Sequence, residues 1–274
     1  MVATPIGNLQ DISLRALEVL KSVDTIAAED TRHTAHLLTH FGIKAKMIAL
    51  YEHNERRAGQ KILDALHSGQ SVALVSDAGT PGISDPGAVL VGMARDVGIN
   101  VVPLPGACAA VTALSAAGFE HPHFLFYGFL PASGAQRRRA LEGLREQEAV
   151  LVFYEAPHRV LESVQDMVDV LGGARRILVA RELTKTFETL HRCALQEAIG
   201  WMQADPNQQR GEFVLLVEGA APPAQNDVND EAQRVLRLLL DELPLKQAVK
   251  LATDITGAKK NVLYQLALEL KSNG

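Results

Sequence analysis

The chain has 274 residues, of which 47% are hydrophobic and 22% are charged, and its formal net charge is −5. This length favours two domains, because single cores usually stop growing near this size. The acidic total excludes a polycation, so any nucleic-acid surface must be a local patch. The two cysteines, Cys108 and Cys193, lack the spacing of a zinc site or a disulfide framework, which favours a reducing, cytoplasmic compartment. No segment approaches membrane-spanning length and no signal peptide precedes the first predicted strand, so we expect no membrane partner.

Short apolar segments alternate with helical patterns along residues 1–117. This alternation predicts an N-terminal domain built on a parallel sheet with helices on its faces. Asp11 or Ser13 is predicted to cap the first helix, because a short polar side chain accepts a bond from a free helical N–H group. The predicted strands are residues 1–3, 25–28, 47–50, 72–75 and 100–103.

Residues 76–87 read Ser-Asp-Ala-Gly-Thr-Pro-Gly-Ile-Ser-Asp-Pro-Gly and lie between a predicted strand and a predicted helix over residues 88–97. So many glycines and prolines exclude a strand or a helix. Glycine lets the backbone approach a ligand, and open α/β sheets bind ligands at the loops that follow their strands. We therefore predict a ligand-binding loop, with a long structural turn as the alternative. Residues 4–8, 103–110 and 154–159 are predicted to line the same cleft.

These loops exclude several common ligands and reactions. None contains the phosphate-binding G-x-x-x-x-G-K-[ST] or the dinucleotide-binding G-x-G-x-x-G, and no G-x-S-x-G elbow is present. Loop 103–110 leads into a helix whose free N–H groups favour a carboxylate, so the cleft suits a small zwitterionic cofactor. No metal is expected: His33, His36 and His40 share a helical spacing typical of a solvated face, and no carboxylate or cysteine completes a ligand set.

Residues 118–219 are predicted to form a second domain. Its predicted strands have fewer helices between them, which predicts a mixed sheet. Residues 220–230 are rich in Ala, Pro, Asn, Asp and Gln and are predicted to be a linker. Residues 231–274 are predicted to be helical, and their Thr256-Gly257 turn resembles a helix-turn-helix, with a dimerisation or packing appendage as the alternative. The predicted strands of the second half are residues 124–129, 150–154, 177–180 and 213–217.

Seven motifs that end or follow the predicted strands carry a resemblance to a known family. In chain order they are Thr4-Pro-Ile-Gly-Asn-Leu, Ala28-Glu-Asp-Thr-Arg-His, Leu74-Val-Ser-Asp-Ala-Gly-Thr-Pro-Gly-Ile-Ser-Asp-Pro-Gly, Pro103-Leu-Pro-Gly-Ala-Cys-Ala-Ala, Phe153-Tyr-Glu-Ala-Pro-His-Arg, Ala180-Arg-Glu-Leu-Thr-Lys and Gly211-Glu-Phe-Val-Leu-Leu-Val-Glu-Gly. Together they resemble the tetrapyrrole methylase superfamily, and more closely its small-subunit ribosomal RNA (cytidine-2′-O)-methyltransferases. The opening Thr-Pro-Ile-Gly-Asn and the Gly-Thr-Pro of the central loop depart from the porphyrin-modifying branch and favour the ribosomal one.

The resemblance implies a fold of two α/β domains with S-adenosylmethionine in the cleft between them, and a homodimer. It implies 2′-O-methylation of a cytidine in small-subunit (16S) ribosomal RNA, either naked or in the assembled subunit. The alternatives are a tetrapyrrole (porphyrinogen) methylase, a non-enzymatic RNA-binding protein, and a metal-dependent hydrolase that no spacing supports. By position in the motifs, the implied cofactor-binding residues are Pro5, Gly79, Thr80, Ile83, Cys108, Ala109 and Tyr154.

A ribose hydroxyl is a poor nucleophile, so the enzyme must align it and help to remove its proton. Asp30, Glu155 and Glu182 each end a predicted strand and are candidates to accept this proton or orient the hydroxyl. Arg32, Arg159 and Lys185 are candidates to hold phosphate or to steady those carboxylates. A structural salt bridge is the alternative for each of them.

A run of arginines at residues 137–139 and the lysines of the C-terminal segment supply local positive charge despite the acidic total. We predict that Arg137 and Arg138, together with Arg139, contact RNA. The alternative is a solvated helix face, which charge runs usually are.

Overall fold

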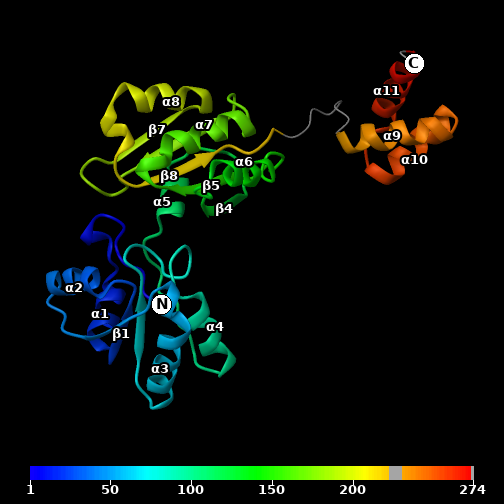
Figure 1. The fold of residues 1–274 in the computed structure, drawn as a ribbon. Helices are drawn as coiled ribbons and strands as arrows, with labels where there is room; N and C mark the ends of the chain where they lie inside the picture. The colour runs from blue at the N-terminus through cyan, green and yellow to red at the C-terminus, as the bar shows by residue number, and fades with distance from the viewer. Residues whose placement is uncertain (222–229, 273–274) are drawn as a thin grey trace. The chain divides into compact units, whose positions relative to one another are not determined.

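The computed structural model describes residues 1–221 and 230–272 (Figure 1). It divides into two units, Met1–Gly219 and Ala220–Gly274, which we describe separately. Most of the predicted linker, at residues 222–229, and the end of the predicted helical segment, at residues 273–274, lie outside the described residues.

The first unit begins with a three-stranded parallel sheet. Strand β1 (Thr25–Ala28) lies between β2 (Lys46–Ala49) and β3 (Val72–Val75). The predicted strand at residues 1–3 is not a regular strand: the Val2 N–H donates to the Leu74 carbonyl of β3 at 2.9 Å, and an isolated bridge joins the next residue, Thr4, to Gly79.

The predicted strand at residues 100–103 is wrong, because this segment forms no ladder of strand bonds. Its neighbour is the N-terminal segment: the amino group of Met1 donates to the Val102 carbonyl at 3.0 Å, and Leu104 N–H donates to the Met1 carbonyl at 3.0 Å. Residues 1–4 therefore lie between β3 and loop 103–110, which brings three of the four predicted cleft loops together.

Helices cover both faces of this sheet. Leu20 and Leu38 pack with Ile26 on one face, and Ile62 and Leu90 pack with Ala27 on the other. Ser13, rather than Asp11, caps the first helix, since its Oγ accepts the Ala16 N–H at 3.1 Å. The helices are α1 (Leu14–Ser22) and α2 (Thr31–His40) on the first face, and α3 (Glu55–His67) and α4 (Ala88–Asp96) on the second.

A five-stranded mixed sheet follows, as predicted, in the order β4-β5-β8-β6-β7, with β4 parallel to β5 and the other pairs antiparallel. Strand β7, which was not predicted, is an edge strand in which every residue is exposed or half-buried. The strands are β4 (Phe124–Phe129), β5 (Val150–Glu155), β6 (Arg176–Arg181), β7 (Thr189–Ala194) and β8 (Phe213–Val217).

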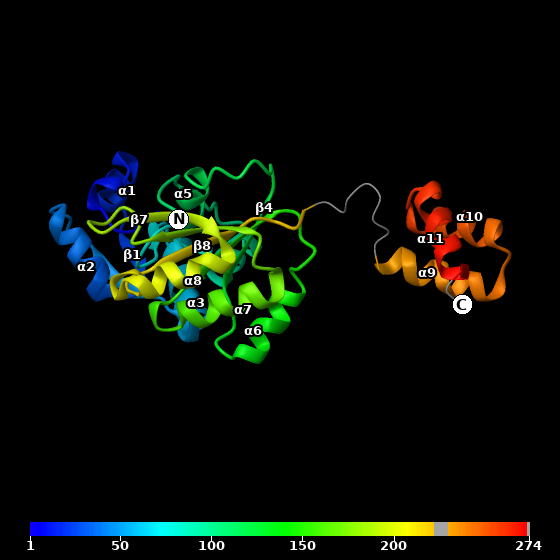
Figure 2. The same ribbon diagram turned by 90° about the horizontal axis from the view of Figure 1, so that it is seen from above.

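Alternate residues of the central strands face opposite layers, as strand geometry requires. Leu151 and Phe153 pack under α6 (Gly134–Glu142), α7 (Val160–Leu171) and α8 (Leu195–Ala204), which cover one face of the sheet (Figure 2). Val150 and Val152 pack against α5 (Ala109–Ser115) on the other face. This small-residue helix lies on the side of the sheet that faces the first sheet (Figure 1).

The second unit contains three helices in its described part: α9 (Asp230–Glu242), α10 (Leu245–Thr256) and α11 (Lys260–Ser272). They enclose their own core around Leu236, Val249 and Leu263. Gly257, with φ +71°, ends α10 in the left-handed conformation that suits glycine, which makes the sharp turn into α11. Within the described residues of the whole chain, no helix has the length and apolar character needed to cross a bilayer.

Candidate active site

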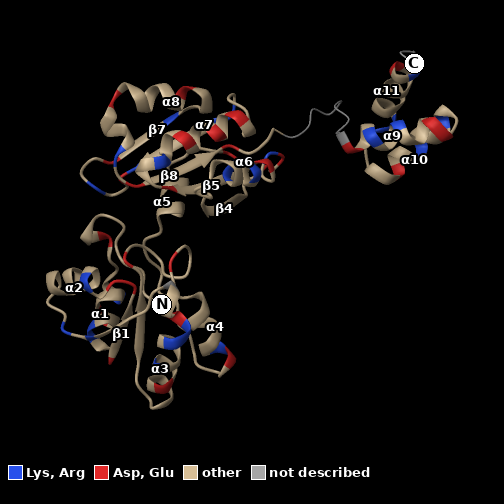
Figure 3. Cartoon of the chain, viewed as in Figure 1, with Lys and Arg blue, Asp and Glu red and all other residues tan. Residues whose placement is uncertain are grey.

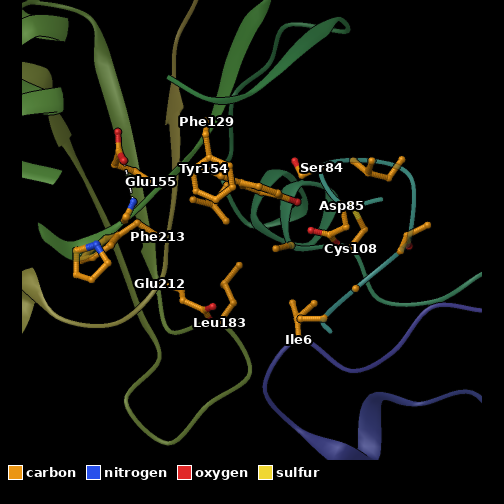
Figure 4. A pocket seen from close by; sticks show the side chains of 18 residues that line it. Ile6, Ser84, Asp85, Cys108, Phe129, Tyr154, Glu155, Leu183, Glu212 and Phe213 are labelled. Atoms are coloured by element: carbon orange, nitrogen blue, oxygen red, sulfur yellow. Dashed lines mark hydrogen bonds between the residues drawn. The ribbon is translucent and has the colours of Figure 1, made fainter. Parts of the chain in front are cut away.

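Loop 76–87, the start of α5 and the ends of β5 and β8 surround a first cavity of about 350 Å³ (Figure 4). Its walls are largely apolar. The ring of Tyr154 meets those of Phe126 and Phe129 edge-on, at centroid distances of 5.0 and 5.7 Å. The Tyr154 hydroxyl accepts the N–H of Ala110 at 3.2 Å, and burial raises the pKa of this phenol. The larger apolar wall residues are Ile6, Ile83, Phe129, Leu183, Phe213 and Val214.

Three sets of hydrogen bonds, one between backbone groups and two between side chains and backbone, join the loops of the first half into one wall. Gly79, at φ +80°, exchanges two hydrogen bonds with Thr4, of 2.9 and 3.0 Å. The Thr80 hydroxyl donates to the Ala107 carbonyl at 2.9 Å. The carboxylate of Glu55 accepts the N–H of Gly87, at 2.9 Å, and two more N–H groups at the start of α4, which fixes the far end of loop 76–87.

The structure brings together all but one of the residues that the resemblance implies for the cofactor. Pro5 is the exception, since it lines a neighbouring cavity. The implied cofactor residues that line the first cavity are Gly79, Thr80, Ile83, Cys108, Ala109 and Tyr154.

The second cavity, of about 570 Å³, adjoins the first. Ile6, Ala78 and Glu212 line both cavities. The second cavity is more polar than the first. Its polar wall residues are Thr4, His33, Thr34, His36, Ser76, Asp77, Lys185 and Glu212.

Asp30 and Arg32 lie at the start of α2 and line neither cavity. The Asp30 carboxylate caps the helix by accepting the Arg32 N–H at 2.8 Å, and it forms an ion pair with the Arg32 guanidinium at 2.6 Å. The guanidinium lowers the pKa of Asp30, and neither cavity gives a ligand access to this carboxylate. The structure therefore gives Asp30 a capping role in place of the predicted catalytic one.

Glu155 borders the first cavity, but its side chain is fully buried and its carboxylate is bonded to other groups of the protein. It accepts bonds from the Ser163 hydroxyl at 2.5 Å, from the Ala156 N–H at 2.8 Å and from the Arg159 guanidinium. The predicted catalytic role of Glu155 does not fit this geometry, because three partners inside the protein already occupy its carboxylate. Arg159 uses its Nε in this ion pair, and its contact with phosphate stays a prediction.

Glu182 and Lys185 lie in a tight turn after β6, where Glu182 and Thr184 have positive φ. Lys185 Nζ contacts Glu182 at 2.8 Å and Glu212 at 2.6 Å. Burial acts to raise the pKa of Glu182, but bonds from Lys185 and from the Glu212 N–H lower it overall. Lys185 lines the second cavity, whereas Glu182 lines neither and serves to hold Lys185 and the backbone of Glu212.

The arginine run divides between the interior and the surface. Arg137 is 3% exposed and its Nε lies 2.5 Å from the carboxylate of Asp166, on the neighbouring helix α7. The prediction that Arg137 contacts RNA therefore conflicts with its burial. Arg138, which also pairs with Asp166, and Arg139 are exposed. Figure 3 shows the basic residues of α6 in blue.

Sequence reasoning missed three carboxylates near the cavities: Asp77, Asp85 and Glu212. Burial raises the pKa of Asp85, which lines the first cavity. Asp77 lines the second, and its Oδ1 accepts the Asp30 N–H at 3.0 Å. Both aspartates lie in loop 76–87, which the sequence predicts to be a ligand-binding loop. Their position in this loop is the signal that could have identified them.

Comparison with known proteins agrees with this geometry. The family "Tetrapyrrole (Corrin/Porphyrin) Methylases" matches residues 1–199, and "RsmI C-terminal HTH domain" matches residues 226–271. The "Ribosomal RNA small subunit methyltransferase I" of Pseudomonas aeruginosa is 56% identical over 270 residues, covering 98% of this chain and 96% of that protein.

Two solved structures share the fold of the first unit. The methyltransferase CobJ has a TM-score of 0.58 at 19% identity, over 78% of this chain and 91% of that one. A uroporphyrin-III C-methyl transferase from Thermus thermophilus, complexed with S-adenyl homocysteine, has a TM-score of 0.54 at 14% identity, over 79% and 95%. The resemblance and the predicted fold class are confirmed: the chain belongs to the tetrapyrrole methylase family, in the group of the ribosomal RNA small subunit methyltransferases I.

Proposed function

We propose that this protein transfers a methyl group from S-adenosylmethionine to the 2′-oxygen of a cytidine ribose in small-subunit (16S) ribosomal RNA. The observation that carries the proposal is the 56% identity to a ribosomal RNA small subunit methyltransferase over 98% of the chain. A family relation at this level extends through the loops that build both cavities and into the helical second unit.

The first cavity fits this cofactor chemically. Aromatic faces of Phe129 and Tyr154 suit both a purine and a cation, and the carboxylate of Asp85 suits a cationic group. Backbone from Gly79, Thr80 and Ala109 supplies hydrogen-bonding groups without bulky side chains. When bound, S-adenosylmethionine supplies an electrophilic methyl group on a sulfonium, whose sulfur keeps the electron pair of the broken bond.

The direct test is transfer of tritiated methyl from S-adenosylmethionine to small subunits isolated from cells that lack this protein. Label is expected in a 2′-O-methylcytidine after nucleoside mapping, with naked 16S RNA assayed in parallel. Binding of the cofactor is measured separately by calorimetry. Label in porphyrinogen in place of RNA would indicate the tetrapyrrole reaction, and RNA binding without cofactor binding would indicate a non-enzymatic protein.

Two further properties follow from this assignment. A protein that modifies small subunits is expected in the cytoplasm, and we propose that it works as a homodimer. Exposed aromatic side chains on the edge strand β4 offer an apolar surface for a second copy: Phe124 is 48% and Tyr127 is 38% exposed. Light scattering of the purified protein measures the mass directly.

A further inference from the structure

Glu212 occupies an unusual place between the two cavities. Three residues line both of them, and Ile6 and Ala78 have no ionisable group, so Glu212 is the one ionisable side chain shared by both sets of described wall residues. Its side chain is 76% exposed, and Figure 4 shows it with Leu183 across the hollow from Ile6. A group in this position can reach a ligand in either cavity.

The local backbone holds Glu212 firmly. Its N–H donates to Glu182 Oε1 at 2.9 Å, and its carbonyl accepts the Glu182 N–H at 2.9 Å. The preceding Gly211 has φ +90°, and a Cβ there would lie 2.5 Å from the Glu182 side chain, so the approach of these two loops requires glycine. The carboxylate itself is oriented by Lys185 Nζ at 2.6 Å.

The second cavity has the chemistry of a nucleoside site. Its volume of about 570 Å³ lies within the usual range of small-ligand pockets, roughly 300–1,000 Å³. Asp77 and Glu212 offer carboxylate oxygens, which accept hydrogen bonds from neutral hydroxyl and amino groups. His33 and His36, on the exposed side of α2, supply rings on which a base can stack.

We propose that the second cavity binds the acceptor nucleoside and that Glu212 is a catalytic residue, which orients the ribose 2′-hydroxyl at the boundary of the two cavities and accepts its proton. This inference rests on the proposed function. The hydroxyl oxygen forms a bond to the methyl carbon as the carbon–sulfur bond breaks, and the electron pair of that bond stays on sulfur. The proton passes to the Glu212 carboxylate and from there to water.

The test compares Glu212→Gln with Glu218→Gln. Glu218 lies just past the other end of β8 and is held by Arg176 at 2.5 Å, so its substitution also removes one ion pair but at a distance from both cavities. Because Glu212 is bonded to Glu182 through its backbone, its substitution leaves the loop contacts in place. Methyl transfer in a single turnover is expected to fall about 10²–10⁴-fold in Glu212→Gln and to change little in Glu218→Gln.

Two readouts separate catalysis from structure. Cofactor affinity of Glu212→Gln should stay within threefold of the parent protein, and its transfer rate should rise with pH where the parent rate is level, since hydroxide must then take the proton. A transfer rate within threefold of the parent would overturn the role of Glu212. Failure of the parent protein itself to label small subunits would instead overturn the proposed function.

Occupancy of the second cavity is tested without turnover. His36→Ala removes a ring on which the base is proposed to stack, and His40→Ala removes the same side chain from the same helix outside both sets of wall residues. With S-adenosylhomocysteine bound, His36→Ala should weaken small-subunit binding about tenfold, while His40→Ala should not. Equal affinity of the two variants would show that the acceptor lies elsewhere.

Discussion

Carboxylates around the first cavity differ in how completely the fold uses them. Glu155 has three partners inside the protein, whereas Asp85 lines the cavity, and burial, opposed by a bond from Ser76, raises its pKa. A carboxylate that the fold leaves in a cavity wall, at a cost in solvation, is available to a cationic ligand.

Asp85→Asn should therefore weaken S-adenosylmethionine binding by about tenfold or more, because a hydrogen bond to a charged group contributes about 1.5–3 kcal/mol. The same change should not destabilise the fold at neutral pH. With a folded-state pKa above the unfolded value, Asp85 contributes less to stability as pH rises from 3.8 through the raised pKa, and asparagine removes this loss. Calorimetry measures the affinity and thermal melts against pH measure the stability; unchanged affinity would contradict the prediction.

Neighbouring arginines on α6 should give opposite phenotypes. Arg137→Ala removes the buried partner of Asp166 and leaves only the half-exposed Arg138, at 2.9 Å, so it should cost about 3 kcal/mol of unfolding free energy, the lower end for breaking a buried ion pair. Arg139→Ala changes an exposed side chain and should stay within about 0.5 kcal/mol, yet lower the salt dependence of RNA binding by about one contact. Denaturant unfolding and filter binding at several salt concentrations measure the two effects. A destabilised Arg139→Ala, or one with an unchanged salt slope, would contradict this division.

At the scale of elements, the sequence patterns located the strands whose apolar runs are buried, such as β3 and β8, and the loops that follow them. Segments at the edge of a sheet were harder to predict. Strand β7 has no buried apolar run, and residues 100–103 form no strand ladder and bond to Met1 through Val102, so their pairing depends on partners distant in sequence.

The same limit applies to the site. Loop 76–87 could be predicted from its glycines and prolines, but the capture of Glu155 by Ser163 on α7, and of Arg137 by Asp166, arises from helix packing. Local sequence identifies where backbone can approach a ligand. It does not identify which nearby charged side chains pair with other residues inside the protein.

Loop 4–8 approaches the turn after β6 closely, and this contact is possible because residue 7 is glycine. A Cβ at Gly7 would lie 2.5 Å from Lys185 Cγ and 2.8 Å from the Leu183 carbonyl. Gly7→Ala should therefore displace a wall common to both cavities and reduce methyl transfer at least tenfold. Gly92→Ala is the control: nothing lies within 4 Å inside α4, and the helix should gain about 0.5–1 kcal/mol. Equal activity of both variants would show that the contact is not required.

At the scale of the whole molecule, the two units have separate hydrophobic cores, so we expect the first unit to fold without the second. The residues that pack around Leu236 and Leu263 all come from the second unit, and the cores of the first unit contain none of them. A chain that ends at Gly219 keeps every described wall residue of both cavities. The second unit also carries a set of basic side chains on its described helices: Arg234, Arg237, Lys246, Lys250, Lys260 and Lys271.

Truncation after Gly219 should thus leave S-adenosylmethionine affinity within twofold of the full chain, because the cofactor cavity loses no wall residue. Small-subunit affinity should fall tenfold or more, with a shallower dependence on salt, since each lost phosphate contact removes about 0.7–0.9 from the slope of log affinity against log salt. Calorimetry and filter binding between low and moderate salt measure these two quantities on the same preparation. Loss of cofactor binding would mean that the second unit supports the first cavity, and an unchanged salt slope would assign the RNA contacts to the first unit alone.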